Sequence, residues 1–445
     1  MPNTHAAGRP DKLRVSRRSL LKSGLAAGAV GAFPYVSRAA QPYEVIHWNM
    51  LAASDGEIWG KMIAAFNEAH KDKGVQIRSE LVEESQYLTK LLTAAASGAA
   101  PDFGWGPPRM RYREVKKGVV IPVDEWATKA GLDWNDFSTT SVEMTKYPQF
   151  GTSKYSVPMD LMCLQPLINL DHVADSGLDP NAAPQNGEEL IAWAKAMTRR
   201  DGNTITRSGI MMTGTGVHPA ATWGIVATQM GFKRVSDDLK TAAINEEAGI
   251  AAMKWVLDLF DVHKVSTRDI TDRYKAFGNG QGSIFWTGPW TLNGYVNQGL
   301  NFKSALFPKI GKIHATYFDM GALEMYAQKD PKRYEPTMMA IKWLSDNSLL
   351  WTTVGRGATP RKSIASSEAY KTKGFPWAKR GAFIDGLDIA TIGEVPVAAA
   401  PDFSIYYGGA LVAKTLEGVW AGLKTPEQAM TELKTKWQAS LDSNT

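Results

Sequence analysis

Hydrophobic positions near the start of the chain change repeatedly between the spacing of a strand and that of a helix. Residues 44–50, Glu-Val-Ile-His-Trp-Asn-Met, predict a first buried strand, and apolar residues between 58 and 66 recur at helical spacing. Alternation over 75–81 predicts a second strand, and leucines between 88 and 95 predict a second helix that Gly98 ends. Strand, helix, strand and helix at this spacing predict a parallel crossover connection and an α/β fold.

Residues 283–290, Ser-Ile-Phe-Trp-Thr-Gly-Pro-Trp, combine a strand pattern with a turn. Three apolar residues of high β-propensity lead into Thr-Gly-Pro, which ends the strand sharply. The glycine-dense segment 277–282 before them has the composition of a loop, with no room for a helix or strand of its own. We therefore expect a rigid turn around Gly288 that presents Trp286 and Trp290. Ligand sites favour strand ends and loops, so Trp290 is expected at a binding surface, whereas Trp286 could also fill the core.

The chain has 445 residues, 44% hydrophobic and 21% charged, which is ordinary for a globular protein. This length favours two lobes of roughly 150–200 residues over a single domain. The 15 tryptophans are unusual. Because an indole has a flat apolar face and one donor, it suits stacking on a sugar ring or another flat ligand face, although a bulky core would also use it.

The formal net charge of +5 comes from the N-terminal segment. Residues 1–39 hold seven of the 50 basic residues and one of the 45 acidic ones, which leaves 43 basic and 44 acidic residues in the remainder. Basic residues after this segment are scattered, with no stripe interleaved with aromatic residues. We therefore expect no nucleic-acid partner.

The N-terminal segment has the organisation of a signal peptide. The basic residues 16–22 precede a weakly apolar stretch, 23–33, and small residues follow at 37 and 39. The Ser-Arg-Arg-Ser-Leu-Leu-Lys run resembles a twin-arginine export signal, which implies export by the twin-arginine machinery and removal of residues 1–39. The apolar stretch is too short to span a bilayer, and the segment contains no cysteine for lipid attachment. The single Cys163 cannot form an internal disulfide.

A family resemblance begins at residues 94–105, Ala-Ala-Ala-Ser-Gly-Ala-Ala-Pro-Asp-Phe-Gly-Trp. This run resembles a signature of the extracellular solute-binding proteins of carbohydrate ABC importers. The resemblance continues over almost all of the chain after the signal segment. Its most specific match is the run of residues 276–290, which ends in Gly-Pro-Trp. The other motifs stand in the family's order at 118–124, 154–160, 307–321 and 425–429.

The resemblance implies an α/β protein of the type II periplasmic-binding-protein fold, in which two lobes, each a mixed sheet flanked by helices, close on a ligand about a hinge. By analogy, residues 42–157 and 305–357 form lobe 1, and residues 158–304 and 358–445 form lobe 2. The family also implies a soluble, monomeric protein of the periplasm, without a lipid anchor. Such a protein would capture a mono- or oligosaccharide and deliver it to the permease subunits of an ABC importer, with no catalysis, cofactor or metal.

The candidate ligand-binding residues follow from strand ends and loops that would face the cleft. Asp160 could accept hydrogen bonds from two vicinal hydroxyls, or it could hold backbone amides at the hinge. Arg356 could neutralise an anionic ligand or be an exposed structural arginine, and Glu83 and Glu84 are interpreted as solvated charges. The full set of candidates is Trp48, Trp105, Asp160, Trp223, Trp286, Gly288, Trp290, Gly321, Arg356, Tyr406 and Tyr407.

Two other functions stay open. A phosphorylated polyol, such as glycerol 3-phosphate or its diesters, is an alternative ligand, and Arg356 would then matter. An exported polysaccharide hydrolase is the alternative from another class, because two carboxylates with aromatic residues would serve it. The sequence contains no His-x-x-x-His pair, no Gly-x-Ser-x-Gly elbow and no Walker loop, which disfavours the common hydrolase and nucleotide-binding classes.

Overall fold

The computed structural model describes residues 42–392, 400–405 and 410–443, all of which belong to one compact unit. The expected signal segment and the candidates Tyr406 and Tyr407 lie outside these described residues. The alternation expected at the start of the chain is confirmed, since two parallel strands alternate with two helices. These elements are β1 (Tyr43–Asn49), α1 (Ala53–Ala69), β2 (Val75–Leu81) and α2 (Tyr87–Ser97), which Gly98 caps in the left-handed conformation.

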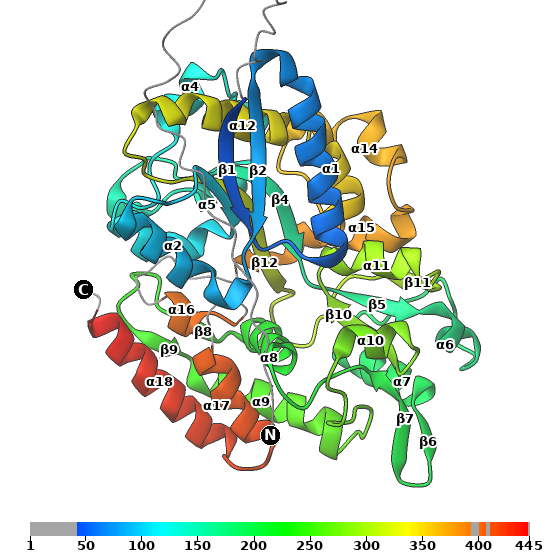
Figure 1. Cartoon of the computed structure of the whole chain (residues 1–445). Helices are drawn as coiled ribbons and strands as arrows, with labels where there is room; N and C mark the ends of the chain where they lie inside the picture. The colour runs from blue at the N-terminus through cyan, green and yellow to red at the C-terminus, as the bar shows by residue number, and fades with distance from the viewer. Residues whose placement is uncertain (1–41, 393–399, 406–409, 444–445) are drawn as a thin grey trace, which may run out of the picture. The chain divides into compact units, whose positions relative to one another are not determined.

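The first sheet is mixed and has the strand order β13-β12-β3-β1-β2, with β4 also pairing with β12. Figure 1 labels β1, β2, β4 and β12 of this sheet. Strand β1 lies parallel to both of its neighbours, whereas β12 runs antiparallel to β3 and β4. Helices α1 (Ala53–Ala69) and α12 (Tyr334–Asp346) pack against this sheet and share its hydrophobic core. Its remaining strands are β3 (Phe103–Gly106), β4 (Val157–Cys163), β12 (Thr316–Met325) and β13 (Ala390–Ile392).

The second sheet is also mixed, with the order β11-β5-β10-β7-β6. Its central strand β10 pairs parallel to β7 and antiparallel to β5. A separate hydrophobic core lies on this sheet and includes residues of α8 (Val217–Met230), α9 (Glu246–Asp261), α17 (Ala410–Trp420) and α18 (Pro426–Asp442). The strands are β5 (Gln165–Asn169), β6 (Arg199–Asp201), β7 (Thr204–Ile210), β10 (Gly282–Thr287) and β11 (Phe302–Ser304).

The chain passes between the two sheets at short connections. Strand β4 of the first sheet is followed directly by β5 of the second, with Leu164 between them. The return runs from β11 through residues 305–315 to β12. The first sheet therefore extends to Cys163, beyond the lobe boundary at residue 157 inferred from the resemblance. That boundary and the others stay predictions.

The strand and turn expected around Gly288 are present. Strand β10 ends at Thr287, and a short 3-10 turn follows at Pro289–Thr291. The expectation of a loop throughout 277–282 is wrong at both ends, because α10 (Arg273–Gly278) includes its first two residues and β10 begins at Gly282. The Asp272 side chain accepts hydrogen bonds from two backbone N–H groups of the first turn of α10, which allows a short helix there.

Candidate functional site

A cavity of about 1190 Å³ is lined by elements that belong to both sheets and by the loops between them. Strand β3 of the first sheet contributes Trp105, and the start of helix α1, which packs on that sheet, contributes Asp55. From the second come helix α10 with Tyr274 and the turn after β10 with Trp290. Ligand sites of α/β proteins favour such places, where strands end and loops converge.

Arg356 lies between two tryptophans of this lining. Its guanidinium carbon is 4.7 Å from the ring centroid of Trp105 and 5.4 Å from that of Trp290. Its Nε lies 2.9 Å from Oδ2 of Asp55, and both side chains of this ion pair are largely buried. Arg356 follows the π-helical turn η8 (Trp351–Gly355). Its charge thus comes from a different chain segment than Asp55 of α1, Trp105 of β3 and Trp290 of the turn after β10. The arrangement joins Trp105 and Trp290, which are 185 residues apart in sequence, through one cation.

The Asp55 carboxylate has two opposing influences on its ionisation. Burial raises the pKa of Asp55, and the charge and hydrogen bonding of Arg356 lower it. Breaking a buried ion pair by removing one partner leaves a costly unpaired charge. Arg356 is therefore committed to a structural role inside the cavity lining, in addition to any contact with a ligand.

Asp160 is fully buried and interacts electrostatically with Arg356 and Asp55 of this cluster. Its Oδ2 accepts a hydrogen bond from Trp351 Nε1 at 2.7 Å, and its Oδ1 accepts one from the backbone N–H of Gly321 at 3.1 Å. Burial, only partly offset by Arg356, raises the pKa of Asp160 to about 6. The structure thus contains the hydrogen bond from the Gly321 backbone, and Asp160 is not among the residues that line the cavity. A ligand contact by Asp160 stays a prediction.

Gly321 lies where no side chain would fit. A Cβ atom there would be 2.5 Å from Cζ2 of Trp105 and 2.6 Å from Oδ2 of Asp160. The β12–β4 pairing shifts register between Gly321 and Ala322, as in a β-bulge. Gly288 has a similar role in the turn after β10, since a Cβ there would overlap the ring of Trp290. The absence of a side chain at these two glycines therefore makes room for the rings of Trp105 and Trp290.

Three of the tryptophan candidates do not reach the cavity. Trp223 and Trp286 are buried in the core of the second sheet, where their Nε1 atoms donate to Gly249 O at 2.9 Å and to Thr222 Oγ1 at 2.6 Å. Trp48 donates to Glu80 Oε2 at 2.9 Å and belongs to a smaller buried cluster. The structure thus brings Trp105, Trp290 and Arg356 together with Asp55, and it places these other rings in packing roles.

Several lining residues were not singled out as ligand contacts from the sequence. Asp55 is buried in the first turn of α1, directly after the first strand, and that place could have indicated it. Tyr274 accepts a hydrogen bond from Arg273 at 2.8 Å, and Trp290 Nε1 donates to its hydroxyl at 3.3 Å. Glu84, interpreted as a solvated charge, is exposed but also lines the cavity. No sequence motif marks Arg273 or Tyr274, because their place depends on how α10 packs beside β10.

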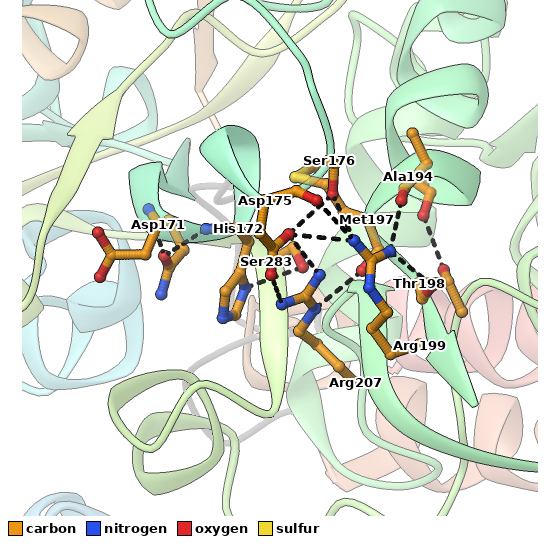
Figure 2. Close-up of polar contacts among 12 residues, drawn as sticks. Asp171, His172, Asp175, Ser176, Ala194, Met197, Thr198, Arg199, Arg207 and Ser283 are labelled. Atoms are coloured by element: carbon orange, nitrogen blue, oxygen red, sulfur yellow. Dashed lines mark hydrogen bonds and ion pairs between the residues drawn. The ribbon is translucent and has the colours of Figure 1, made fainter. Parts of the chain in front are cut away.

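A polar network near the second sheet lies outside the cavity lining (Figure 2). Asp175 accepts hydrogen bonds from Arg207 at 2.7 and 2.9 Å and from Arg199 at 3.1 Å, and the Arg207 hydrogen bond lowers the pKa of Asp175 to about 2. His172 Nδ1 is 3.0 Å from Ser283 Oγ, and burial lowers the pKa of His172 to about 4. Ser283 is fully buried in β10, so a substrate could not reach its hydroxyl. This network joins α6 (Leu170–Ala174) to β6, β7 and β10.

The described residues contain no group of three or more His, Cys, Asp or Glu side chains that could hold a metal ion. Within the same residues, no helix is both long and apolar enough to cross a bilayer.

The two mixed sheets and the cavity between their loops define a two-lobed α/β binding-protein architecture. The sequence model of the family described as "Bacterial extracellular solute-binding protein" matches residues 52–320, more than half of the chain. The chain belongs to this family. A search of curated protein sequences found no match.

Solved structures of the same fold are similar over most of the chain. An ABC substrate-binding protein from Listeria monocytogenes in complex with cycloalternan is 19% identical, with a TM-score of 0.74, over 90% of this chain and 99% of that one. A maltose/maltodextrin-binding domain from Bdellovibrio bacteriovorus bound to maltotriose is 19% identical, with a TM-score of 0.73 and coverage of 90% and 99%. UgpB from Mycobacterium tuberculosis in complex with glycerophosphocholine is 16% identical, with a TM-score of 0.76 and coverage of 90% and 98%.

Proposed function

We propose that this protein captures a neutral carbohydrate in the cavity and delivers it to the permease subunits of an ABC importer. The single observation that carries the proposal is the pair of indoles, Trp105 and Trp290, that line one large cavity on either side of Arg356. A flat aromatic face suits a sugar ring, and Trp290, which is partly exposed, could offer one, whereas Trp105 is buried under Arg356 and supports that side of the cavity. The charged and phenolic groups of the lining suit hydroxyls. Family membership supports solute binding, and the sugar complexes among the similar structures support the ligand class.

The cavity volume supports an oligosaccharide. The cavity volume of about 1190 Å³ exceeds the roughly 300–1,000 Å³ of typical small-molecule sites. Three carboxylates and four cationic side chains line it, and one of the cations, Arg111, is paired with the buried Glu324 at 2.9 Å. The remaining charges balance, which favours a neutral ligand over an ionic one.

The second candidate is a phosphorylated polyol or one of its diesters. The similarity to the glycerophosphocholine complex favours it, and Arg356 is the cation that would meet a phosphate. Its ion pair with Asp55 opposes this role, because an anion bound there would have to compete with a buried carboxylate.

We propose the following export route, location and working state for the protein. Residues 1–39 would act as a twin-arginine signal, and the protein would work in the periplasm as a monomer that is neither lipid-anchored nor an enzyme. The lobes, with boundaries as inferred from the resemblance, would close around the ligand and so mark the loaded state for the permease.

The test is a thermal-shift measurement on the chain from residue 40 onward, against neutral sugars, polyols and their phosphates. A ligand at a thousand times its dissociation constant adds about 4 kcal/mol to stability, which is easily detected. Stabilisation by a neutral sugar is the expected result. Stabilisation by phosphorylated polyols alone would replace the proposal with the second candidate, and release of reducing sugar from a polysaccharide would favour the hydrolase.

A further inference from the structure

A buried arginine outside the cavity lining has no carboxylate partner in the part of the chain that the structure describes. Arg380 lies in α15 (Trp377–Asp385) and is 4% exposed. Its Nε donates to Phe375 O at 3.0 Å and its Nη2 donates to Tyr370 O, so two backbone carbonyls hold the guanidinium. Its Nη1 is also buried and has no hydrogen-bond partner. One donor of a buried cation is therefore left without an acceptor, which is costly because the group has lost its hydration.

The other buried arginines show what is missing at Arg380. Three arginines are buried among residues 42–392, 400–405 and 410–443. Arg111 forms an ion pair with Glu324 at 2.9 Å, and Arg361 forms one with Asp136 at 2.9 Å. A paired cation recovers part of the cost of leaving water, whereas an unpaired one does not. The fold thus supplies a carboxylate to two of these three arginines, and Arg380 is the exception.

A second unpartnered polar atom lies on the neighbouring helix, α14 (Glu368–Thr372). It is the hydroxyl oxygen of the buried Tyr370, whose ring centroid is 5.0 Å from the guanidinium carbon of Arg380. Burial raises the pKa of Tyr370, and the Arg380 charge lowers it. The Thr359 backbone and the Arg380 side chain also approach the hydroxyl closely enough to lower this pKa, but neither makes a hydrogen bond of ordinary geometry with it. Both unpartnered groups can donate a hydrogen bond, so together they favour one shared acceptor.

The cover of these two groups is a surface side chain. The ring centroid of Trp377 is 5.2 Å from the guanidinium carbon of Arg380, and Trp377 is 47% exposed. Its indole packs on the bare backbone of Gly381, where a Cβ atom would be 2.3 Å from Nε1. Exposed side chains change rotamer rapidly, whereas core side chains are held by their packing. Rotation of Trp377 would therefore open the guanidinium to solvent from one side without disturbing the core.

The surface around Arg380 attracts negative ions. Residues 366–384 contain four basic residues and one acidic residue, Glu368. In the described part of the protein none of these four cations forms an ion pair; they are Lys371, Lys373, Lys379 and Arg380. A group of like charges raises the local concentration of counter-ions. An anion is therefore attracted to the same segment in which two buried donors lack an acceptor.

We propose that Arg380 and Tyr370 form a binding site for a small oxyanion, a phosphate or a carboxylate group, with Trp377 as its movable cover. The guanidinium and the hydroxyl would each donate to an oxygen of the anion, and the anion would compensate the buried charge.

The site lies on the segment through which the chain passes from η8 to the second sheet. The Phe375 N–H donates to Thr353 O of η8 at 3.4 Å, and α15 packs on β11 of the second sheet (Figure 1). A bound anion would thus join α14 to α15 and stabilise this connection. The inference does not depend on the proposed carbohydrate function.

The experiment follows the indole N–H resonance of Trp377 in the ¹⁵N-labelled chain from residue 40 onward. This resonance is identified by its loss in Trp377→Phe. Sodium phosphate and sodium acetate test the two oxyanions, and sodium chloride at the same ionic strength is the control salt. We expect the resonance to move along a saturable curve with phosphate, acetate or both, and without saturation with chloride.

Two variants test the donors. Tyr370→Phe removes only the hydroxyl and should weaken the saturable binding about tenfold or more, because one hydrogen bond to a charged group is lost. Arg380→Gln removes the charge and should abolish the binding. The matched controls are Tyr334→Phe, whose hydroxyl is paired with Gln328, and Arg361→Gln, which removes a buried arginine elsewhere. Both controls should keep the wild-type dissociation constant, and Tyr370→Phe decides if Arg380→Gln does not fold.

A saturable response to phosphate or acetate that both test variants weaken supports the site, and the salt that saturates at the lower concentration identifies the oxyanion. The absence of a saturable response in the wild type would overturn the site. Binding that is equally tight in the wild type and in either test variant would overturn its assignment to these two residues. Saturation by chloride alone would contradict an oxyanion site, because the bound ion would then be a halide.

Discussion

Gly321→Ala tests whether Trp105 of the cavity lining and the buried Asp160 are packed on Gly321 as closely as the structure indicates. The added methyl group would lie 2.5 Å from Trp105 Cζ2 and 2.6 and 2.8 Å from the two carboxylate oxygens of Asp160. Both neighbours are buried, and Asp160 is held by Trp351 as well as by the Gly321 N–H, so neither can move away freely. The substitution therefore displaces the Trp105 ring, the Asp160 carboxylate, or both.

The expected cost follows from overpacking of a well-packed interior. Inserting one extra carbon into such a site costs typically about 1–3 kcal/mol. We expect the free energy of unfolding of Gly321→Ala to fall by that amount in urea titrations. We also expect sugar affinity to fall, because a displaced Trp105 would move Arg356, which packs on its ring in the cavity lining.

The control for Gly321→Ala is Gly60→Ala in helix α1, where a Cβ would meet nothing within 4 Å. Alanine is favoured over glycine inside a helix, so this variant should be as stable as the wild type or more stable by up to about 1 kcal/mol. A Gly321→Ala protein that unfolds within about 0.5 kcal/mol of the wild type and binds sugar equally well would refute the close packing of Trp105 on Asp160.

Three further predictions concern the site, its pH dependence and the last helix. Trp290→Ala should weaken sugar binding at least about tenfold, or roughly 1.4 kcal/mol, with an unchanged circular dichroism spectrum; equal affinity by calorimetry would remove Trp290 from the site. Because burial raises the pKa of Asp160 from 3.8 to about 6, the folded state binds an extra proton between these values. Stability should therefore fall, on the order of 1–3 kcal/mol, as the pH rises from about 4 to 6, and a urea titration series on Asp160→Asn should lack this component. Thr425→Ala removes the N-cap of α18, where Thr425 and Gln428 form a capping box, and should cost about 1 kcal/mol in thermal unfolding; an unchanged midpoint would show that the cap does not contribute.

The local elements of this protein were predictable because they depend on short-range patterns. The alternation of strand and helix over the first 60 described residues follows from hydrophobic spacing, and the turn after β10 follows from Thr-Gly-Pro. The loop expected over 277–282 was wrong, because Asp272 caps a helix that extends to Gly278. A single capping side chain thus outweighed the helix-breaking tendency of glycine at the end of that helix.

The candidate residues divide by how far their environment depends on distant chain segments. Tryptophan was recognised as a residue suited to stacking, but whether an indole faces a cavity or a core depends on what packs on its other side. Trp286 and Trp290 are four residues apart, yet one donates to Thr222 in the core and the other lies against Arg356 at the cavity. Periodicity cannot separate them, because strand β10 ends between them at Thr287 and Trp290 belongs to the turn that follows.

By itself, the sequence determined an α/β chain with parallel strands at its start, an aromatic turn at residues 286–290, and a resemblance to solute-binding proteins. The tertiary structure alone decided that Asp55, Trp105, Trp290 and Arg356 meet around one cavity, because they come from four segments that only folding brings together. It also decided that Asp160 holds the backbone of Gly321, since the β4–β12 register places the two residues opposite each other. Local preference acts through neighbours in sequence, whereas a buried charge or an unpaired donor is defined by neighbours in space.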